Sequence, residues 1–191
     1  MRVDRLVVAS KNPDKIAEIR KVLGESGLNI ELVEDLDWPD VEETGATLEE
    51  NALKKAREVF EATGIPALAD DTGLFVDALG GLPGVNTARF AGDNATYAEN
   101  VARLLEELKG IGERAACFRT VIALVADTDE LVAEGALPGR IAEAPRGNGG
   151  FGYDPVFELA SGRTLAELAQ SEKNDVSHRA MALRNLFAEL D

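Results

Sequence analysis

The chain has 191 residues, of which 45% are hydrophobic and 29% charged, and its formal net charge is −15. This length suits one domain or two closely joined lobes, and folding at this size buries roughly 70% of the surface that the unfolded chain exposes. The acidic balance argues against general binding of nucleic acid or anionic membranes, because both need a positive field, but it leaves room for a locally basic pocket.

Cysteine content and hydropathy narrow the class further. Cys117 is the only cysteine, so neither an internal disulfide nor a cysteine-based zinc site is available. The apolar run from Leu6 to Ala9 is too short for a signal-peptide core, and no stretch approaches the roughly 20 apolar residues of a membrane span. We therefore expect a soluble cytoplasmic protein.

Helices and strands alternate in the first part of the chain. Arg5 to Ala9 is typical of a buried strand, and Pro13 predicts the start of a helix because proline is favoured at the first helical position. A short strand is expected from Ile30 to Val33. The capping box Thr47-Leu-Glu-Glu50 predicts a helix to about residue 62.

The segment from Ala67 to Val76 contains two adjacent carboxylates, Asp70 and Asp71. Asp, Thr and Gly at positions 70–73 predict a polar break between two strand-like segments, and an ordinary turn is the simpler interpretation. In extended backbone, however, the two carboxylates would point to opposite sides. One could then hold a hard cation or take a proton from water while the other braces the loop.

The second half adds a hairpin to this pattern. A second capping box, Thr96-Tyr-Ala-Glu99, predicts another helix. A long apolar strand is predicted from Ala115 to Ala126, a turn at Thr128-Asp129 and a returning strand from Leu131 to Ala136. The last helix is predicted from Ser177 to Leu190. Together the elements predict an α/β fold with a mixed sheet flanked by helices.

Two polar stretches could bind phosphate and metal. Ser10-Lys-Asn-Pro-Asp-Lys15 joins a strand to a helix, where free N–H groups and the helix dipole favour an anion. The alternative is a helix capped by Asn12 with Lys15 solvated. Glu42-Glu43 could join the Asp70-Asp71 pair as oxygen ligands of Mg²⁺, and the alternative there is a solvated acidic surface.

Two further stretches could bind a ligand. Gly147-Asn-Gly-Gly-Phe-Gly-Tyr-Asp-Pro155 matches G-x-G-x-x-G, but it opens no helix, so a dinucleotide site is rejected. A loop that offers Phe151 and Tyr153 as stacking surfaces is preferred to one whose aromatic rings lie in the core. In Ser177-His178-Arg179 the serine and histidine are mere neighbours, so no catalytic triad is indicated. The guanidinium suits a phosphate or keto oxygen, and a capping serine with two solvated residues is the alternative.

In chain order these stretches resemble the inosine triphosphate pyrophosphatase family. The motifs are Ser10-x-Asn12-x-x-Lys15, Glu42-Glu-Thr-Gly45, Glu50-Asn-Ala52 with Lys54-Lys-Ala56, Ala69-Asp-Asp-Thr-Gly-Leu74, Leu79-Gly-Gly-Leu-Pro-Gly84 with Ala88-Arg-Phe-Ala-Gly92, Gly149-Gly-Phe-Gly-Tyr-Asp-Pro155 and Ser177-His-Arg179. The resemblance implies an elongated mixed sheet with two lobes around a central active-site cleft. Residues 1–191 would form one domain without a separable linker, and the protein would be a homodimer. The implied reaction hydrolyses ITP, dITP or XTP to the monophosphate and pyrophosphate with Mg²⁺.

The resemblance also assigns roles to residues. Asp71 would be the catalytic base, and Glu43 and Asp71 would bind the metal. Phosphate would be bound by Ser10, Lys11, Asn12, Pro13, Asp14 and Lys15. Thr72 would make a further substrate contact, and Lys173 would add positive charge. The base pocket would be formed by Phe151, Gly152, Tyr153, Asp154, His178 and Arg179. Lys11 and Thr87 depart from the family's frequent glycine and serine, and neither departure touches the implied chemistry.

Two other functions remain open. A pyrophosphatase of the related Maf type, acting on pyrimidine or modified nucleotides, would share the opening strand, the phosphate loop and the acidic cluster. The motifs around Phe151 and Arg179 argue against it. A nucleotide-binding domain without turnover is the third possibility, and the intact carboxylates Glu43, Asp70 and Asp71 argue against that.

Overall fold

A computed structural model of the chain describes residues 1, 3–127 and 129–190, with the backbone alone at residue 174. Its helices and strands are β1 (Arg5–Val8), α1 (Pro13–Glu25), β2 (Glu31–Val33), α2 (Leu48–Thr63), β3 (Ala67–Val76), β4 (Pro83–Gly84), α3 (Tyr97–Glu107), β5 (Ala115–Ala126), β6 (Asp129–Ile141), β7 (Phe157–Glu158), α4 (Gln170–Val176) and α5 (His178–Phe187). Thr128, in the predicted hairpin turn, lies outside the described residues.

The strands form one mixed sheet, as predicted. Within the described residues its order is β2-β1-β3-β5-β6-β7, with β4 paired to β3. β1 runs parallel to β2 and β3, whereas β3–β4 and β6–β7 are antiparallel pairs. The predicted α/β class, a mixed sheet flanked by helices, is therefore confirmed.

The chain divides into two compact units. Unit 1 comprises Met1–Asp71, Thr120–Gly135 and His178–Asp191, and unit 2 comprises Thr72–Arg119 and Ala136–Ser177. The strands β3, β5 and β6 each contribute one part to each unit. The single domain with two lobes around a cleft stays a prediction.

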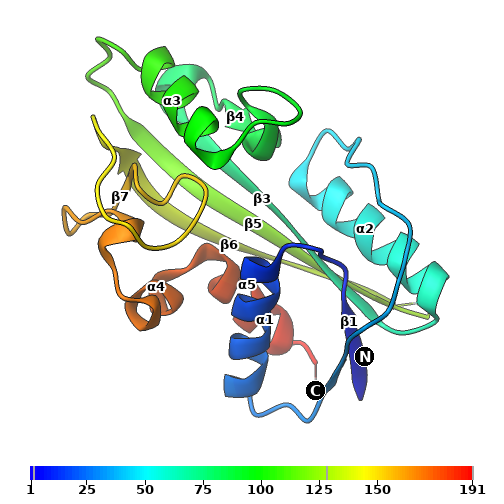
Figure 1. The fold of residues 1–191 in the computed structure, drawn as a ribbon. Coiled ribbons are helices and arrows are strands. Elements are labelled where there is room, and N and C mark those ends of the chain that lie inside the picture. The colour runs from blue at the N-terminus through cyan, green and yellow to red at the C-terminus, as the bar shows by residue number, and fades with distance from the viewer. Residues whose placement is uncertain (2, 128, 191) are drawn as a thin grey trace. The chain divides into compact units, whose positions relative to one another are not determined.

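Unit 1 packs helices on both faces of its strands. Leu6 and Val8 of β1 join a buried cluster with α1 and α5, while Val7 between them is buried on the other face. In Figure 1, α2 lies on the side of these strands opposite α1 and α5. The alternation of a strand explains this arrangement, because successive side chains must enter different layers.

Capping residues set the helix starts where the sequence placed them. Asn12 caps α1 with Pro13 in its first turn, and the Thr47–Glu50 and Thr96–Glu99 boxes open α2 and α3. Each cap side chain accepts a hydrogen bond from a backbone N–H that the first helical turn leaves unpaired. The sequence Thr164-Leu-Ala-Glu167 likewise predicts a capped short helix, but the structure forms only a single 3₁₀ turn there, Leu165–Glu167.

The polar break predicted at residues 70–73 is wrong, because β3 runs through it without interruption. Asp70 and Asp71 are only 2% and 5% exposed. Gly73 serves the sheet rather than a turn: a Cβ there would lie 2.8 Å from the carbonyl oxygen of Gly84 in β4. Local turn propensity is thus overridden by the packing of both faces and by a close approach of two backbones.

Candidate active site

The Ser10–Lys15 segment of unit 1 is a capped helix start. The Asn12 side-chain oxygen accepts hydrogen bonds from the backbone N–H groups of Asp14 and Lys15, at 2.9 and 3.4 Å. The Asn12 backbone N–H donates to Ser10 Oγ at 3.2 Å. The capping alternative for Asn12 therefore holds, while its companion, a solvated Lys15, is wrong: Lys15 Nζ lies 3.1 Å from Asp70 Oδ2.

The other residues of this segment face outward. Pro13 and Asp14 are exposed. Lys11 is exposed as well, and its ammonium donates to Asp40 Oδ1 at 2.5 Å. That hydrogen bond raises the pKa of Lys11 above its usual value. Lys11 thus adds charge at the edge of the loop, whereas Lys15 turns inward.

Asp70 lies on the α1 and α5 side of β3, among cations. Arg179 Nε donates to Asp70 Oδ2 at 3.0 Å, and Arg179 Nη1 donates to Glu18 Oε2 at 2.5 Å. Burial alone would raise the pKa of Asp70, but the charges of Lys15 and Arg179 outweigh burial and hold it well below its usual range. These cations therefore favour the charged form of Asp70, and the carboxylate in turn fixes two cationic side chains.

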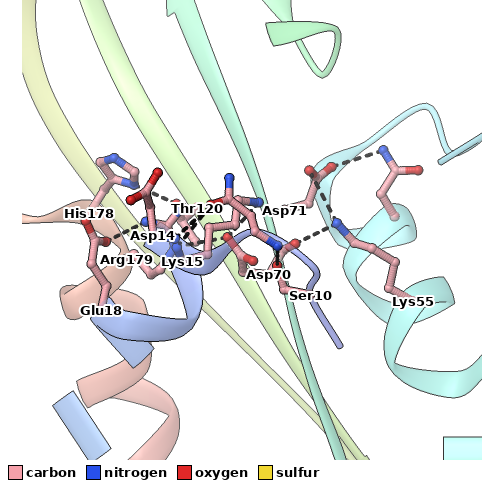
Figure 2. Close-up of polar contacts among 12 residues, drawn as sticks. Ser10, Asp14, Lys15, Glu18, Lys55, Asp70, Asp71, Thr120, His178 and Arg179 are labelled. Carbon is pink, nitrogen blue, oxygen red and sulfur yellow. Dashed lines mark hydrogen bonds and ion pairs between the residues drawn. The ribbon is translucent and has the colours of Figure 1, made fainter. Parts of the chain in front are cut away.

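Asp71 points the other way, toward α2. Asn51 Nδ2 donates to Asp71 Oδ2 at 3.0 Å, and Lys55 Nζ lies 3.8 Å from Asp71 Oδ1. Burial raises the pKa of Asp71, opposed by Lys55 and assisted by the nearby Glu43. Figure 2 shows the contrast, with Asp70 directed to Lys15 and Arg179 and Asp71 directed to Lys55. The predicted opposite orientation of the two carboxylates is confirmed.

Lys55 connects three acidic residues. Its ammonium donates to Glu43 Oε1 at 2.5 Å and to the backbone carbonyl of Asp70 at 2.6 Å, besides its approach to Asp71. Burial lowers the pKa of Lys55, but Asp71, Asp70 and Glu43 together raise it. Glu42 is exposed and Glu43 is half-buried, so the acidic pair is split between solvent and this cluster.

His178 and Arg179 begin α5 and are both buried, which makes the alternative of two solvated residues wrong. His178 Nδ1 and Thr120 Oγ1 are 2.6 Å apart in a hydrogen bond. The contacts of Arg179 with two carboxylates fix the plane of its guanidinium. Unit 1 therefore presents a rigid guanidinium and an oriented imidazole side by side in sequence.

Unit 2 holds the other predicted substrate residues. Lys173 Nζ donates to Asp154 Oδ2 at 2.7 Å and lies 4.5 Å from the centre of the Phe151 ring. The Asp154 carboxylate also accepts from the backbone N–H of Phe151 at 2.8 Å. This buried ion pair and cation–π contact hold the Phe151 ring in place.

Phe151 and Tyr153 behave differently. Phe151 is half-buried, while Tyr153 is 3% exposed and its hydroxyl donates to the Thr87 carbonyl at 2.9 Å. The core alternative thus holds for Tyr153, and Phe151 keeps an accessible ring. Gly152, between them, has a φ of +62°, and Thr72 in β3 is half-buried.

The sequence alone predicts no role for Lys55, Asn51, Glu18 or Thr120. Asn51 and Lys55 nevertheless lie in the motifs Glu50-Asn-Ala52 and Lys54-Lys-Ala56, and their spacing carries a signal. They are polar residues four positions apart in α2, on the face that also carries the buried Leu48 and Ala52. A polar pair at this spacing on a buried helix face predicts a buried polar partner. Glu18 and Thr120 carry no such signal, because their partners lie far away in the sequence.

The donors for a metal are few. Among the described residues no group of three or more His, Cys, Asp and Glu side chains could hold a metal ion. Mg²⁺ nevertheless needs only one or two carboxylates beside waters and substrate phosphates. Glu43 and Asp71 meet this requirement, since both carboxylates lie within 4 Å of the same cationic group, the ammonium of Lys55.

In the described part of the chain no helix is long and apolar enough to span a membrane.

The chain is similar in sequence to known proteins. The model of the Ham1 family matches residues 6–189. A dITP/XTP pyrophosphatase of Mycolicibacterium paratuberculosis is 50% identical, with 97% of this chain and 95% of that protein covered. A dITP/XTP pyrophosphatase of Ralstonia nicotianae is 48% identical, with 97% of this chain and 96% of that protein covered.

Solved structures agree with the sequence comparison. A Ham1 protein from Coxiella burnetii has a TM-score of 0.90 and 45% identity, covering 100% of this chain and 98% of that one. The Staphylococcus aureus Ham1 protein has a TM-score of 0.85 and 35% identity, covering 97% of each chain. These matches extend over nearly the whole chain.

Proposed function

The chain belongs to the Ham1 family, and from this premise we propose that it hydrolyses the non-standard purine nucleotides ITP, dITP and XTP to the monophosphate and pyrophosphate. The observation that carries the proposal is Asp71, a buried carboxylate with a raised pKa, held by Asn51 and Lys55 close to Glu43. The names of the relatives support the substrate class. The function includes cleansing of the nucleotide pool in the cytoplasm by a homodimer.

Asp71 acts as the general base. A water oxygen attacks the α-phosphorus, its proton passes to the Asp71 carboxylate, and the bond from the α-phosphorus to the bridging oxygen breaks. A raised pKa suits this role, because a stronger base takes the proton more readily. Pyrophosphate leaves with the bridging oxygen.

Glu43 and Asp71 hold Mg²⁺. Mg²⁺ would supply positive charge near the phosphate oxygens and make the attacking water easier to deprotonate. Lys55 balances the two carboxylates from the protein side. Lys15 and Lys173 bind phosphate oxygens of the substrate and stabilise the leaving pyrophosphate. The Ser10–Lys15 loop, including Lys11, Asn12, Pro13 and Asp14, and Thr72 complete the phosphate contacts.

The purine base is recognised through hydrogen-bond polarity. Hypoxanthine and xanthine carry a 6-keto acceptor, which Arg179 and His178 meet with donors, whereas adenine carries a 6-amino donor. The ion pairs of Arg179 with Asp70 and Glu18 preorganise the guanidinium for this contact. Phe151 stacks on the base, with Gly152, Tyr153 and Asp154 shaping the loop around it. A mismatched buried polar group can discriminate by roughly 10⁴.

One substrate panel separates this function from its alternatives. Pyrophosphate release with Mg²⁺ is measured from ITP, dITP, XTP, dTTP, UTP and ATP side by side. We expect turnover of the three non-standard purines with a large preference over ATP. Turnover of dTTP or UTP instead would indicate the Maf-type activity, and binding of ITP without release of pyrophosphate would indicate a non-catalytic domain.

A further inference from the structure

Asn51 is a buried asparagine whose amide has a defined orientation. The side chain is 1% exposed. Its Oδ1 accepts a hydrogen bond from the backbone N–H of Gly45 at 2.7 Å, and its Nδ2 donates to Asp71 Oδ2 at 3.0 Å. A backbone N–H can only donate and a carboxylate can only accept, so both partners require the same assignment of the amide oxygen and nitrogen.

The backbone on the far side of this amide carries Glu43. Gly45 lies two residues after Glu43, and a Cβ at Gly45 would lie 2.7 Å from Asn51 Oδ1 and 2.8 Å from the Cβ of Glu50. The absence of a side chain therefore lets this segment lie directly against α2. Lys54 Nζ, which donates to the Glu42 carbonyl at 2.6 Å, holds the same segment from a neighbouring position.

Lys55 and Asn51 both link Asp71 to the Glu43 segment, but in different ways. Lys55 is charged and contacts the carboxylates of both proposed metal ligands, Glu43 and Asp71. Asn51 is neutral and contacts Asp71 Oδ2 and the backbone N–H of Gly45, and neither of these two contacts uses Asp71 Oδ1 or the Glu43 carboxylate. Asn51 is thus the neutral link between Asp71 and the Glu43 segment.

The chain contains an internal reference for this arrangement. Asn51 follows the capping box of α2, and Asn100 follows the capping box of α3 at the same helical position. Asn100 Oδ1 also accepts from a backbone N–H of the preceding loop, that of Ala91 at 2.8 Å. Its Nδ2, however, donates to the backbone carbonyl of Ala88 at 2.9 Å. The two asparagines share a structural role, and Asn51 alone of this pair donates to a carboxylate.

We propose that Asn51 is a positioning residue that fixes the rotation of the Asp71 carboxylate and its spacing from Glu43, and so sets divalent-cation affinity and turnover. The proposal rests on the proposed function, which makes Asp71 the base and a metal ligand. Residues that orient metal ligands through hydrogen bonds typically contribute about 10–100-fold to metal affinity or activity.

The test compares Asn51→Asp, Asn51→Leu and Asn100→Leu with the wild-type chain. Asn51→Asp keeps an acceptor for the Gly45 N–H, removes the donor to Asp71 and adds a carboxylate beside it, whereas Asn51→Leu removes both hydrogen bonds without adding a charge. Binding of Mn²⁺ alone is followed by loss of the free-ion signal in electron paramagnetic resonance. Pyrophosphate release from ITP gives kcat and KM, and thermal unfolding reports whether each variant is folded.

We expect kcat to fall about 10–100-fold in both Asn51 variants, with KM for ITP within about threefold of wild type. We expect Mn²⁺ affinity to fall about tenfold in Asn51→Leu. Asn100→Leu should lower the melting temperature and leave Mn²⁺ affinity and kcat of the folded fraction unchanged. The proposal is overturned if the folded Asn51 variants match wild type in kcat and Asn51→Leu also matches wild type in Mn²⁺ affinity. It is equally overturned if Asn100→Leu loses as much kcat or as much Mn²⁺ affinity as the Asn51 variants do.

The same data distinguish failure of this proposal from failure of the proposed function. A wild-type chain that binds Mn²⁺ but releases no pyrophosphate from any nucleotide contradicts the proposed function. Weaker Mn²⁺ binding in Asn51→Leu than in Asn100→Leu would then still support positioning of the cation ligands by Asn51. Equal binding in these two variants would overturn it.

Discussion

Asp70 and Asp71 are neighbours in β3, yet the two sides of the strand give them opposite electrostatic surroundings. On the α1 and α5 side, Lys15 and Arg179 hold the pKa of Asp70 well below its usual range against the effect of burial. On the α2 side, burial raises the pKa of Asp71, and Glu43 adds to that effect. The comparison teaches that two identical residues, one position apart, can have pKa values shifted in opposite directions, which suits Asp70 as a fixed anion and Asp71 for its proposed role as a base.

The strongest way to break this comparison is to neutralise Asp70. Asp70→Asn removes the carboxylate that pairs with Lys15 Nζ and with Arg179 Nε in a buried setting. Breaking a buried ion pair in this way costs about 3 kcal/mol or more in the free energy of unfolding. Urea denaturation at pH 7 measures the loss. A variant within about 0.5 kcal/mol of wild type would show that the cations do not depend on Asp70.

A second prediction concerns Arg179, which connects the Asp70 side to the proposed base pocket. Arg179→Lys keeps a positive charge near Asp70 and Glu18 but removes the planar fork of donors. We expect the ratio of kcat/KM for ITP to that for ATP to fall at least about tenfold. An undiminished ratio in the folded variant would count against the assignment of Arg179 to base selection.

The pH dependence of stability sharpens the comparison with a smaller effect. The lowered pKa of Asp70 contributes stability that is present above its unfolded value and is lost as pH falls through the folded value. The raised pKa of Asp71 has the opposite sign, so its charge costs stability above the folded value and the cost is relieved in acid.

Asp71→Asn removes that cost. In the absence of metal we expect this variant to have a free energy of unfolding equal to or above that of wild type at pH 7, with the difference shrinking toward pH 4. Urea denaturation in EDTA at several pH values measures it. A loss of stability at pH 7 as large as that in Asp70→Asn would contradict the opposite signs of the two carboxylates.

Much of the fold could be predicted from local signals. Caps at Asn12, Thr47 and Thr96 set the helix starts, and runs of apolar residues predicted β1 and β5. The continuity of β3 could not be predicted, because the turn propensity of Asp70 to Gly73 is offset only by cations from other elements and by the approach of Gly84.

The candidate site was predictable to a similar extent. Motif order pointed to Glu43, Asp71 and Arg179, and the period of two in a strand predicted that Asp70 and Asp71 diverge. The partners Glu18 and Thr120 were not predictable from the sequence. Glu18 contacts Arg179, 161 residues away in the sequence, and Thr120 contacts His178, 58 residues away. Pairings of this kind are set by tertiary packing, which a single sequence does not display.

The measurement that tests the central claim most directly is the rate of pyrophosphate release from ITP with Mg²⁺ by Asp71→Asn beside wild type. Far-UV circular dichroism and the urea curve establish that the variant is folded. The proposed role of Asp71 as the base predicts a fall in kcat on the order of 10²–10³ or more. A folded Asp71→Asn variant with kcat within about threefold of wild type would contradict the claim that Asp71 activates the water.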